Sequence, residues 1–185
     1  MRDKPVVVLL VEDEEAHVEL VKKAFVKSGS EWEINHVSNL EDTFKWLNEN
    51  DPPSLIIADH LLPDGSGIDL LGKAKRPEDV GIPVIILTGH GTEELAVRSL
   101  KSGAMDYVVK STERFEEMPW IAERVLREWK NITELREKDR ELKEAKEYSP
   151  RYLPRCLIRY VSSISMASEE NLETYLERSR LETWT

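Results

Sequence analysis

Five polar side chains with complementary chemistry follow short apolar runs in the first two thirds of the sequence. Three are carboxylates, one is a hydroxyl and one is a primary amine. Carboxylates that crowd together raise each other's pKa unless a cation neutralises them, and a hard divalent ion such as Mg²⁺ takes oxygen ligands of this kind. In order along the chain, these residues are Glu12, Asp13, Asp59, Thr88 and Lys110.

The amine and the hydroxyl extend this chemistry to an anionic group. Lys110 provides a compact positive charge that can pair with an anion, and Thr88 can donate a hydrogen bond to a phosphoryl oxygen. Gly89 leaves room for that oxygen to approach the backbone. The set therefore predicts a site where a divalent cation and a phosphoryl group meet.

Each of these residues has an ordinary structural explanation when it is taken alone. Glu12 or Asp13 can cap the next helix or lie in its first turn. Asp59 can be a turn residue, Thr88 a helix cap and Lys110 a solvated strand end. The hypothesis of one shared site rests on the five residues taken together. It requires strands and helices that bring all five side chains close to one another.

Five short apolar runs predict the strands that could do so. The runs that begin at Val6, Leu55 and Val84 have almost no polar alternation, which is typical of parallel strands covered on both faces. The run from Trp32 alternates more and suits a peripheral strand. The predicted strands are Val6–Val11, Trp32–Val37, Leu55–Ala58, Val84–Leu87 and Asp106–Val109.

Apolar residues at helical spacing lie between these runs and predict helices. Alternating strands and helices indicate a doubly wound α/β domain, with helices on both faces of the sheet. Functional sites of such sheets lie at the carboxyl ends of the strands, so the polar set should meet at one edge. The stripes are Ala16, Leu20, Val21, Ala24 and Phe25; Leu40, Phe44 and Leu47; Ile68, Leu71 and Ala74; and Leu95, Ala96, Ser99 and Leu100, followed by Gly103 at a C′ position.

The last third of the chain has a different composition. Residues 113–147 are highly charged and lack glycine, and their apolar residues recur at spacings of three, four and seven. This predicts a fifth helix that extends into an amphipathic stalk, with Pro119 in its first turn. A short coiled coil and a single solvated helix both fit, because Glu128 and Asp139 occupy two seam positions. The apolar positions are Ile121, Val125, Ile132, Leu135 and Leu142.

Beyond this stalk, residues 148–185 form a tail of unknown role. Pro150 and Pro154 should end the helix, and Ser168 could cap a last one. Cys156 is the only cysteine in the chain, which excludes an intramolecular disulfide and fits a reducing cytosol.

The net charge of −10 argues against nonspecific binding to nucleic acid or to a membrane surface. No apolar run approaches the roughly 20 residues of a membrane span. We therefore expect a cytoplasmic protein without nucleic-acid or membrane partners.

With these residues in view, the sequence resembles the receiver domain of two-component response regulators. The resemblance covers Val6 to about Lys110, and the order and spacing of four motifs fit that family. It implies a flavodoxin-like five-stranded parallel sheet of order 2-1-3-4-5. We therefore place the receiver domain at 1–115 and the extended helix, which the charged and apolar pattern predicts, at 116–147. The motifs are Leu10-Val11-Glu12-Asp13-Glu14, Ala58-Asp59-His60-Leu61-Leu62-Pro63-Asp64-Gly65-Ser66-Gly67, Ile82-Pro83-Val84-Ile85-Ile86-Leu87-Thr88-Gly89 and Gly103-Ala104-Met105-Asp106-Tyr107-Val108-Val109-Lys110.

The resemblance also implies roles for single residues. Asp59 would accept a phosphoryl group from a histidine kinase or a phosphotransfer protein, with Mg²⁺ as the cofactor. Lys110 and Thr88 would contact the phosphoryl group. Tyr107 lies where the family has its switch aromatic, which rotates inward when Thr88 moves towards the phosphate. The implied metal ligands are Glu12, through water, Asp13, Asp59 and the backbone carbonyl of Leu61.

Some positions near the site depart from the family or stay open. Ser111 follows Lys110 where the family usually has a proline, often after a cis peptide bond, so the lysine could be placed differently. We interpret His60 as an ordinary surface histidine and leave the role of His90 open. The glycines of the loop 63–67 are expected to permit positive φ.

Three other functions compete with a phosphorylated signalling module. A Mg²⁺-dependent phosphotransferase or phosphatase of the haloacid-dehalogenase type would need Asp-x-Asp after the first strand, where the chain has Glu12-Asp13-Glu14. A nucleotide- or flavin-binding domain would need a glycine-rich loop there. The third alternative, a receiver-like scaffold that is never phosphorylated, is compatible with the sequence. We expect no enzymatic activity on outside substrates, and a homodimer through the C-terminal helix is possible.

Overall fold

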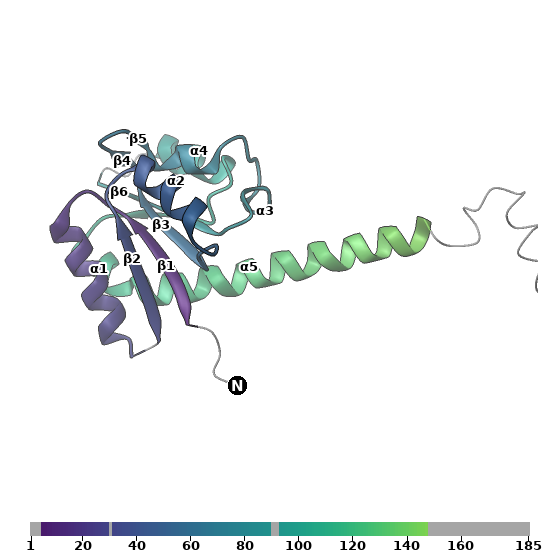
Figure 1. Cartoon of the computed structure of the whole chain (residues 1–185), viewed down its shortest axis with the longest axis horizontal. Helices are drawn as coiled ribbons and strands as arrows, with labels where there is room; N and C mark the ends of the chain where they lie inside the picture. The colour runs from purple at the N-terminus through teal and green to yellow at the C-terminus, as the bar shows by residue number, and fades with distance from the viewer. Residues whose placement is uncertain (1–4, 30, 90–92, 148–185) are drawn as a thin grey trace, which may run out of the picture. The chain divides into compact units, whose positions relative to one another are not determined.

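The computed structural model describes residues 5–29, 31–89 and 93–147. Five strands form one parallel sheet in the order β2-β1-β3-β6-β7, with helices on both faces (Figure 1). Counted along the chain, this is the predicted order 2-1-3-4-5, and the doubly wound fold is confirmed. The strands are β1 Val6–Val11, β2 Trp32–Val37, β3 Leu55–Asp59, β6 Val84–Thr88 and β7 Asp106–Val109.

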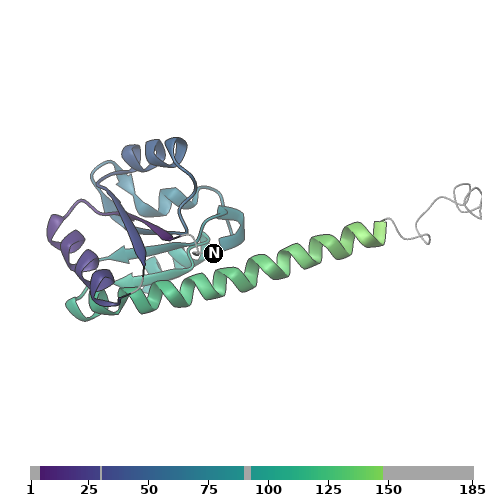
Figure 2. The same cartoon turned by 60° about the horizontal axis from the view of Figure 1, so that its bottom comes forward.

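Two apolar layers hold the sheet, because successive side chains of a strand point to opposite faces. One layer contains Leu10 of β1, Phe25 of α1 and Met118 of α5. The other contains Leu9 of β1 and Leu40 of α2. Figure 2 shows α2 and the first part of α5 on opposite sides of the sheet. The longer helices are α1 Glu15–Lys27, α2 Leu40–Glu49, α4 Glu93–Lys101 and α5 Thr112–Glu147.

The prediction of one helix through Ile68, Leu71 and Ala74 is wrong, because the structure has two shorter helices in this region. The 3₁₀ helix η1, Gly67–Leu71, and the four-residue helix α3, Pro77–Val80, replace it. Gly72, at the end of η1, has a positive φ of 59°, which glycine adopts readily. Arg76, which precedes Pro77, is extended. A short antiparallel pair, β4 Leu61–Leu62 and β5 Gly65–Ser66, follows β3 and was not predicted.

The end of α4 agrees with the sequence prediction. Gly103 has φ 94° and lies at the C′ position. Its N–H donates to the carbonyl of Leu100, and the N–H of Ala104 donates to the carbonyl of Ser99, each over 3.1 Å. This pair of bonds is a Schellman motif, which directs the chain into β7.

Helix α5 differs from the prediction at its start. It begins at Thr112, so Pro119 lies inside the helix rather than in its first turn. A proline inside a helix removes one backbone hydrogen bond, at a cost of about 3 kcal/mol. Phe115, Met118 and Ile121 surround this position in sequence and are buried in the core, so their packing offsets the cost.

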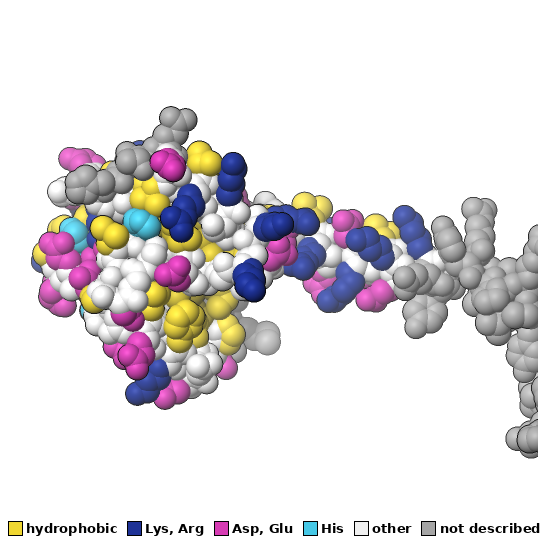
Figure 3. Space-filling view, turned by 90° about the horizontal axis from the view of Figure 1, so that it is seen from above, with side chains coloured by type: hydrophobic (Ala, Val, Ile, Leu, Met, Phe, Trp, Pro, Cys, Tyr) yellow, Lys and Arg dark blue, Asp and Glu magenta, His cyan; other side chains and the backbone are white. Residues whose placement is uncertain are grey.

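Two compact units divide the chain, residues 1–134 and 135–185. In the second unit the structure describes only the end of α5, where Leu135 and Leu142 are 67% and 57% exposed. Charged side chains of both signs alternate along α5 (Figure 3), and ion pairs such as Arg140 with Glu144 link successive turns. A coiled coil at the end of α5 stays a prediction. The boundary between the receiver domain and the extended helix after residue 115 also stays a prediction.

Some sequence predictions lie outside the described residues. These are the tail 148–185 with Cys156, the helix after Ser168, and His90. In the ranges that the structure describes, no helix combines the length and the apolar character that crossing a membrane requires.

Candidate functional site

The strand ends place the predicted polar side chains at one edge of the sheet. Asp59 and Thr88 are the last residues of the neighbouring strands β3 and β6. Thr88 is paired in register with Val109, which directly precedes Lys110. Glu12 follows β1, on the other side of β3. The parallel sheet thus brings together residues that are up to 98 positions apart in sequence.

Lys110 is the centre of this cluster. Its Nζ lies 2.7 Å from Oδ2 of Asp59 and 2.7 Å from Oε2 of Glu12. All three side chains are at least nine-tenths buried. A buried charge is tolerated when it is paired and hydrogen-bonded, and here a single ammonium serves two carboxylates.

The carboxylates of Glu12, Asp13 and Asp59 could hold a cation. One oxygen of each lies within 4.8 Å of the others, and Asp13 is exposed, so the cluster opens to solvent. With the ammonium of Lys110 these groups carry a net charge of −2, the complement of a divalent ion. Oxygen ligands and an open side suit Mg²⁺, which keeps several waters.

The loop after Asp59 depends on a glycine for a reason that the sequence did not reveal. Neither Gly65 nor Gly67 has a positive φ, so that expectation was wrong. A Cβ on Gly67 would lie 2.2 Å from the backbone oxygen of Asp59. The absence of a side chain at Gly67 therefore lets the loop fold back against the end of β3, where its N–H donates to the carbonyl of His60 over 3.1 Å.

Asp64 ties this loop to helix α2. Its two carboxylate oxygens accept hydrogen bonds from the backbone N–H groups of Leu40 and Glu41, each over 2.9 Å. These bonds, above all that from Leu40, lower the pKa of Asp64 below its usual value. The carboxylate also lies at the positive end of the helix dipole. Asp64 is thus a structural residue of the loop that follows β3.

Sequence reasoning missed two histidines that contact the cluster. Nδ1 of His17 lies 3.2 Å from Nζ of Lys110 and 3.2 Å from Oε1 of Glu12. Nε2 of His36, in β2, donates to the backbone carbonyl of Glu12 over 2.8 Å. Their positions in the predicted elements could have indicated this. His17 lies in the first turn of the helix after β1, and His36 lies near the end of the neighbouring strand β2.

His60 is not the ordinary surface histidine that we expected. It is half-buried, and its Nδ1 lies 3.0 Å from Oγ of Ser66. Ser66 also caps η1, since its Oγ accepts from the N–H of Ile68. The imidazole is therefore held by the same loop that covers the end of β3.

The two predicted switch residues lie on neighbouring strands: Thr88 ends β6, whereas Tyr107 is the second residue of β7 and is paired in register with Ile86. Thr88 is 2% exposed, and its carbonyl accepts from the N–H of Lys110 over 2.7 Å. Tyr107 is half-buried and packs against the core layer that contains Ile86. The described chain has no cis peptide bond, so Lys110 joins Ser111 in the trans form.

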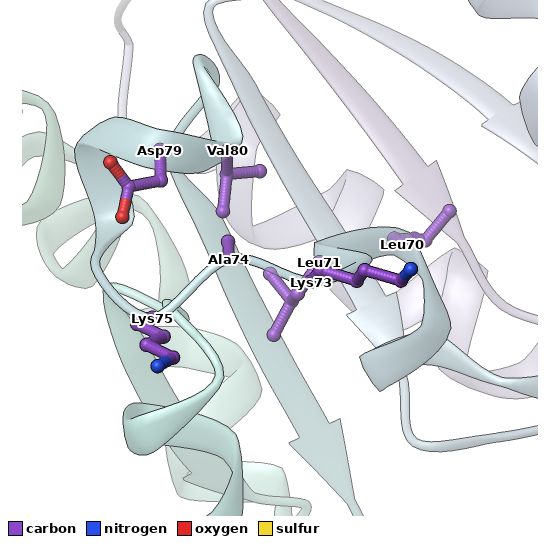
Figure 4. Close-up of a pocket in the computed structure, with 7 residues that line it drawn as sticks. All are labelled: Leu70, Leu71, Lys73, Ala74, Lys75, Asp79 and Val80. Carbon is purple, nitrogen blue, oxygen red and sulfur yellow. The ribbon is translucent and has the colours of Figure 1, made fainter.

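A surface hollow lies elsewhere in the domain. It measures about 450 Å³ and is formed by η1, α3 and the segment between them (Figure 4). Lys73, Lys75 and Asp79 line it together with apolar side chains. None of its lining residues belongs to the carboxylate cluster, so the hollow is separate from the candidate metal and phosphoryl site.

Comparisons with known proteins agree with this geometry. The family model of the response regulator receiver domain matches residues 8–118. The methanogenesis regulatory protein FilR1 of Methanothrix harundinacea is 47% identical over 126 residues, which cover 68% of this chain and 28% of that protein. The phosphate regulon transcriptional regulatory protein PhoB of Escherichia coli is 39% identical over 105 residues, 56% of this chain and 44% of PhoB.

A solved structure supports the same relationship. The Mn²⁺-bound form of response regulator Rcp1 is 28% identical, with a TM-score of 0.56, over 63% of this chain and 94% of Rcp1. The chain spans less than half the length of the two curated relatives. The likeness to each of them therefore concerns only a part of that protein.

Proposed function

Because the chain belongs to the family of response regulator receiver domains, we propose that Asp59 accepts a phosphoryl group from a histidine kinase or a phosphotransfer protein. Both curated relatives are named as regulators, which supports signalling rather than catalysis on an outside substrate. The observation that carries the proposal is the contact of Lys110 with Asp59, 2.7 Å between Nζ and Oδ2, beside two further carboxylates.

The chemistry follows from the demands of phosphoryl transfer. A carboxylate oxygen of Asp59 forms a P–O bond while the P–N bond of a donor phosphohistidine breaks, and the imidazole nitrogen keeps the electron pair. Such transfers need charge neutralisation and positioning more than acid–base catalysis. Bound Mg²⁺, with Glu12, Asp13, Asp59 and the carbonyl of Leu61 as its ligands, would neutralise charge on the carboxylates and on the phosphoryl oxygens.

The chain's own residues then orient the phosphoryl group. In the structure Lys110 pairs with Asp59, and in the phosphorylated protein its ammonium pairs with a phosphoryl oxygen instead. The hydroxyl of Thr88 donates to another oxygen, and Tyr107 turns inward as Thr88 moves. Two discrete arrangements of these side chains give the bistable element that a switch requires.

The output of the switch is partner binding or self-association. The exposed end of α5 offers Leu135 and Leu142, seven positions apart, as a seam for a second copy of the chain. A labile acyl phosphate suits a signal that must decay without a separate enzyme.

The test is phosphorylation of the purified chain. We would incubate it with Mg²⁺ and acetyl phosphate or phosphoramidate and follow its intact mass with time. A gain of one phosphoryl group, lost again on removal of the donor, is the expected result. Asp59→Asn should show no gain, because an amide oxygen is a far weaker nucleophile than a carboxylate oxygen.

Two controls make the outcome specific. Asp51→Asn removes a carboxylate from an exposed loop and should leave the mass gain unchanged. Omission of Mg²⁺ in the presence of a chelator should suppress the gain. An unmodified wild-type mass at saturating donor and Mg²⁺ would instead favour the scaffold that is never phosphorylated.

A further inference from the structure

A histidine without a role in the proposed transfer contacts its central lysine. His17 lies in the first turn of α1, and its Nδ1 is 3.2 Å from Nζ of Lys110. The same Nδ1 is 3.2 Å from Oε1 of Glu12 and 3.2 Å from Oε2 of Glu14. The side chain of His17 is 23% exposed, so most of its surface is buried beside the Lys110 cluster.

We propose that His17 is a positioning residue that holds the Lys110 ammonium beside Asp59. An ammonium has three N–H donors and no acceptor. Nζ of Lys110 donates to Oδ2 of Asp59 over 2.7 Å and to Oε1 of Glu12 over 2.9 Å, and it lies 3.2 Å from Nδ1 of His17. To accept from the ammonium, Nδ1 must keep its lone pair, so in this arrangement His17 is neutral with its proton on Nε2, and its contacts with Glu12 and Glu14 are not hydrogen bonds. The three partners belong to three segments, β3, the end of β1 and α1. Together they fix a flexible side chain with four methylene groups.

The imidazole of His17 also contacts an aromatic ring of the core. Its ring lies 5.2 Å from the ring of Phe115, centroid to centroid, at an interplanar angle of 39°. Phe115 is 3% exposed and belongs to the core layer under α1 and α5. Packing against the core therefore restricts the imidazole of His17. Through its contact with Nζ, the imidazole in turn restricts the side chain of Lys110.

This role matters when the phosphoryl group arrives. Lys110 must exchange its contact with Asp59 for one with a phosphoryl oxygen, and Glu12 must share its charge with a cation. His17 is neither a phosphoacceptor nor one of the proposed metal ligands, so its contact with Lys110 can persist through the exchange. A lysine held in this way needs less ordering to reach the reacting geometry.

The test compares three substitutions of His17, and it rests on the proposed phosphorylation of Asp59. Asparagine places its amide at the same distance from the backbone as Nδ1, and it offers both a donor and an acceptor. Glutamine places its amide one bond further away, and leucine offers no polar atom. A side chain that only packs on Phe115 should favour leucine or glutamine over asparagine, whereas positioning of Lys110 should favour asparagine.

The readout is the initial rate of phosphorylation by acetyl phosphate with Mg²⁺, followed by intact mass. We expect His17→Leu and His17→Gln to be slower than wild type by about fivefold, the effect of one lost hydrogen bond, and His17→Asn to recover most of the rate. Glu19→Leu, on the exposed face of the same helix, is the matched control and should keep the wild-type rate. Thermal unfolding of each variant separates the rate effect from loss of the fold.

Each result decides the question. Wild-type rates in His17→Leu, or equal losses in all three variants, would overturn the positioning role while leaving the proposed function intact. Absence of phosphorylation in the wild-type chain would instead refute the proposed function. A slow, folded leucine variant and a recovered asparagine variant support the inference.

Discussion

The ammonium of Lys110 lies 2.7 Å from Oδ2 of Asp59, although the two residues are 51 positions apart in sequence and come from the ends of β3 and β7, the strands on either side of β6. The same ammonium lies 2.7 Å from Oε2 of Glu12. One positive charge therefore serves two buried carboxylates, while Asp13 adds a third carboxylate within 4.8 Å. Among the described residues, no lysine, arginine or histidine forms a salt bridge with Asp13. Without a metal ion the site carries excess negative charge, which opposes folding.

Neutralising Asp13 should therefore stabilise the protein in the absence of metal. We expect Asp13→Asn, in the presence of a chelator, to raise the free energy of unfolding by about 1 kcal/mol, because like charges that crowd together disfavour the charged forms. Urea denaturation followed by circular dichroism measures this difference. Addition of Mg²⁺ should stabilise the wild-type protein by binding to its native state, and it should stabilise Asp13→Asn much less. Equal stabilisation of both proteins by Mg²⁺ would exclude Asp13 as a ligand.

Gly67 should be the least replaceable glycine near the site. Gly67→Ala forces a Cβ to within 2.2 Å of the backbone oxygen of Asp59, so the loop or the end of β3 must move. Overpacking of this kind costs about 1–3 kcal/mol, and we expect the upper end because the neighbouring atom is backbone. Gly89→Ala is the matched control, since a Cβ there would meet nothing within 4 Å. Denaturant midpoints of the two variants that coincide would contradict this account.

The strands and the site residues could be predicted from the sequence because one signal specifies both. Uninterrupted apolar runs identify buried parallel strands, and the polar residue that ends each run must then lie at the shared edge. This reasoning placed Asp59, Thr88 and Lys110 correctly at adjoining strand ends. Their roles in phosphorylation stay a prediction, which the mass gain of the purified chain tests.

Other features could not be predicted, because they depend on packing between segments distant in sequence. His17 gained its contact with Lys110 only once α1 lay beside the end of β7. Gly67 is required by the approach of one backbone to another, which no local pattern reports. Pro119 was placed in a first turn because local rules disfavour proline inside helices, whereas core packing of α5 overrides them.

Asp64 caps the N-terminus of α2 with its two carboxylate oxygens. This cap predicts that the free energy of unfolding depends on pH with a definite sign. Hydrogen bonds from the backbone of Leu40, above all, and of Glu41 lower the pKa of Asp64 in the folded state. The unfolded chain therefore takes up the proton first as pH falls, and stability due to Asp64 is lost as pH falls through its folded pKa. We expect the difference in unfolding free energy between wild type and Asp64→Asn to be constant near neutral pH and to shrink below about pH 4, the ordinary pKa of aspartate.

Chemical denaturation at a series of pH values measures this difference. Asp51→Asn, in an exposed loop before β3, is the control for the removal of a carboxylate at a site without such a cap. A stability difference for Asp64→Asn that stays the same down to about pH 2, well below the ordinary pKa of aspartate, would show that the cap does not depend on ionisation.

Self-association through the end of α5 is the last expectation to be tested. Leu135 and Leu142 are 67% and 57% exposed in the single chain, and their spacing of seven puts both on one helix face. If this face is the seam of a dimer, light scattering across a dilution series should show a concentration-dependent mass in the wild-type chain. Leu135→Ala with Leu142→Ala should weaken the association by at least about tenfold, because each buried leucine contributes roughly 2 kcal/mol. Glu141→Ala, next to the seam, should leave it nearly unchanged, whereas a monomeric wild-type chain at every concentration would favour a solvated helix.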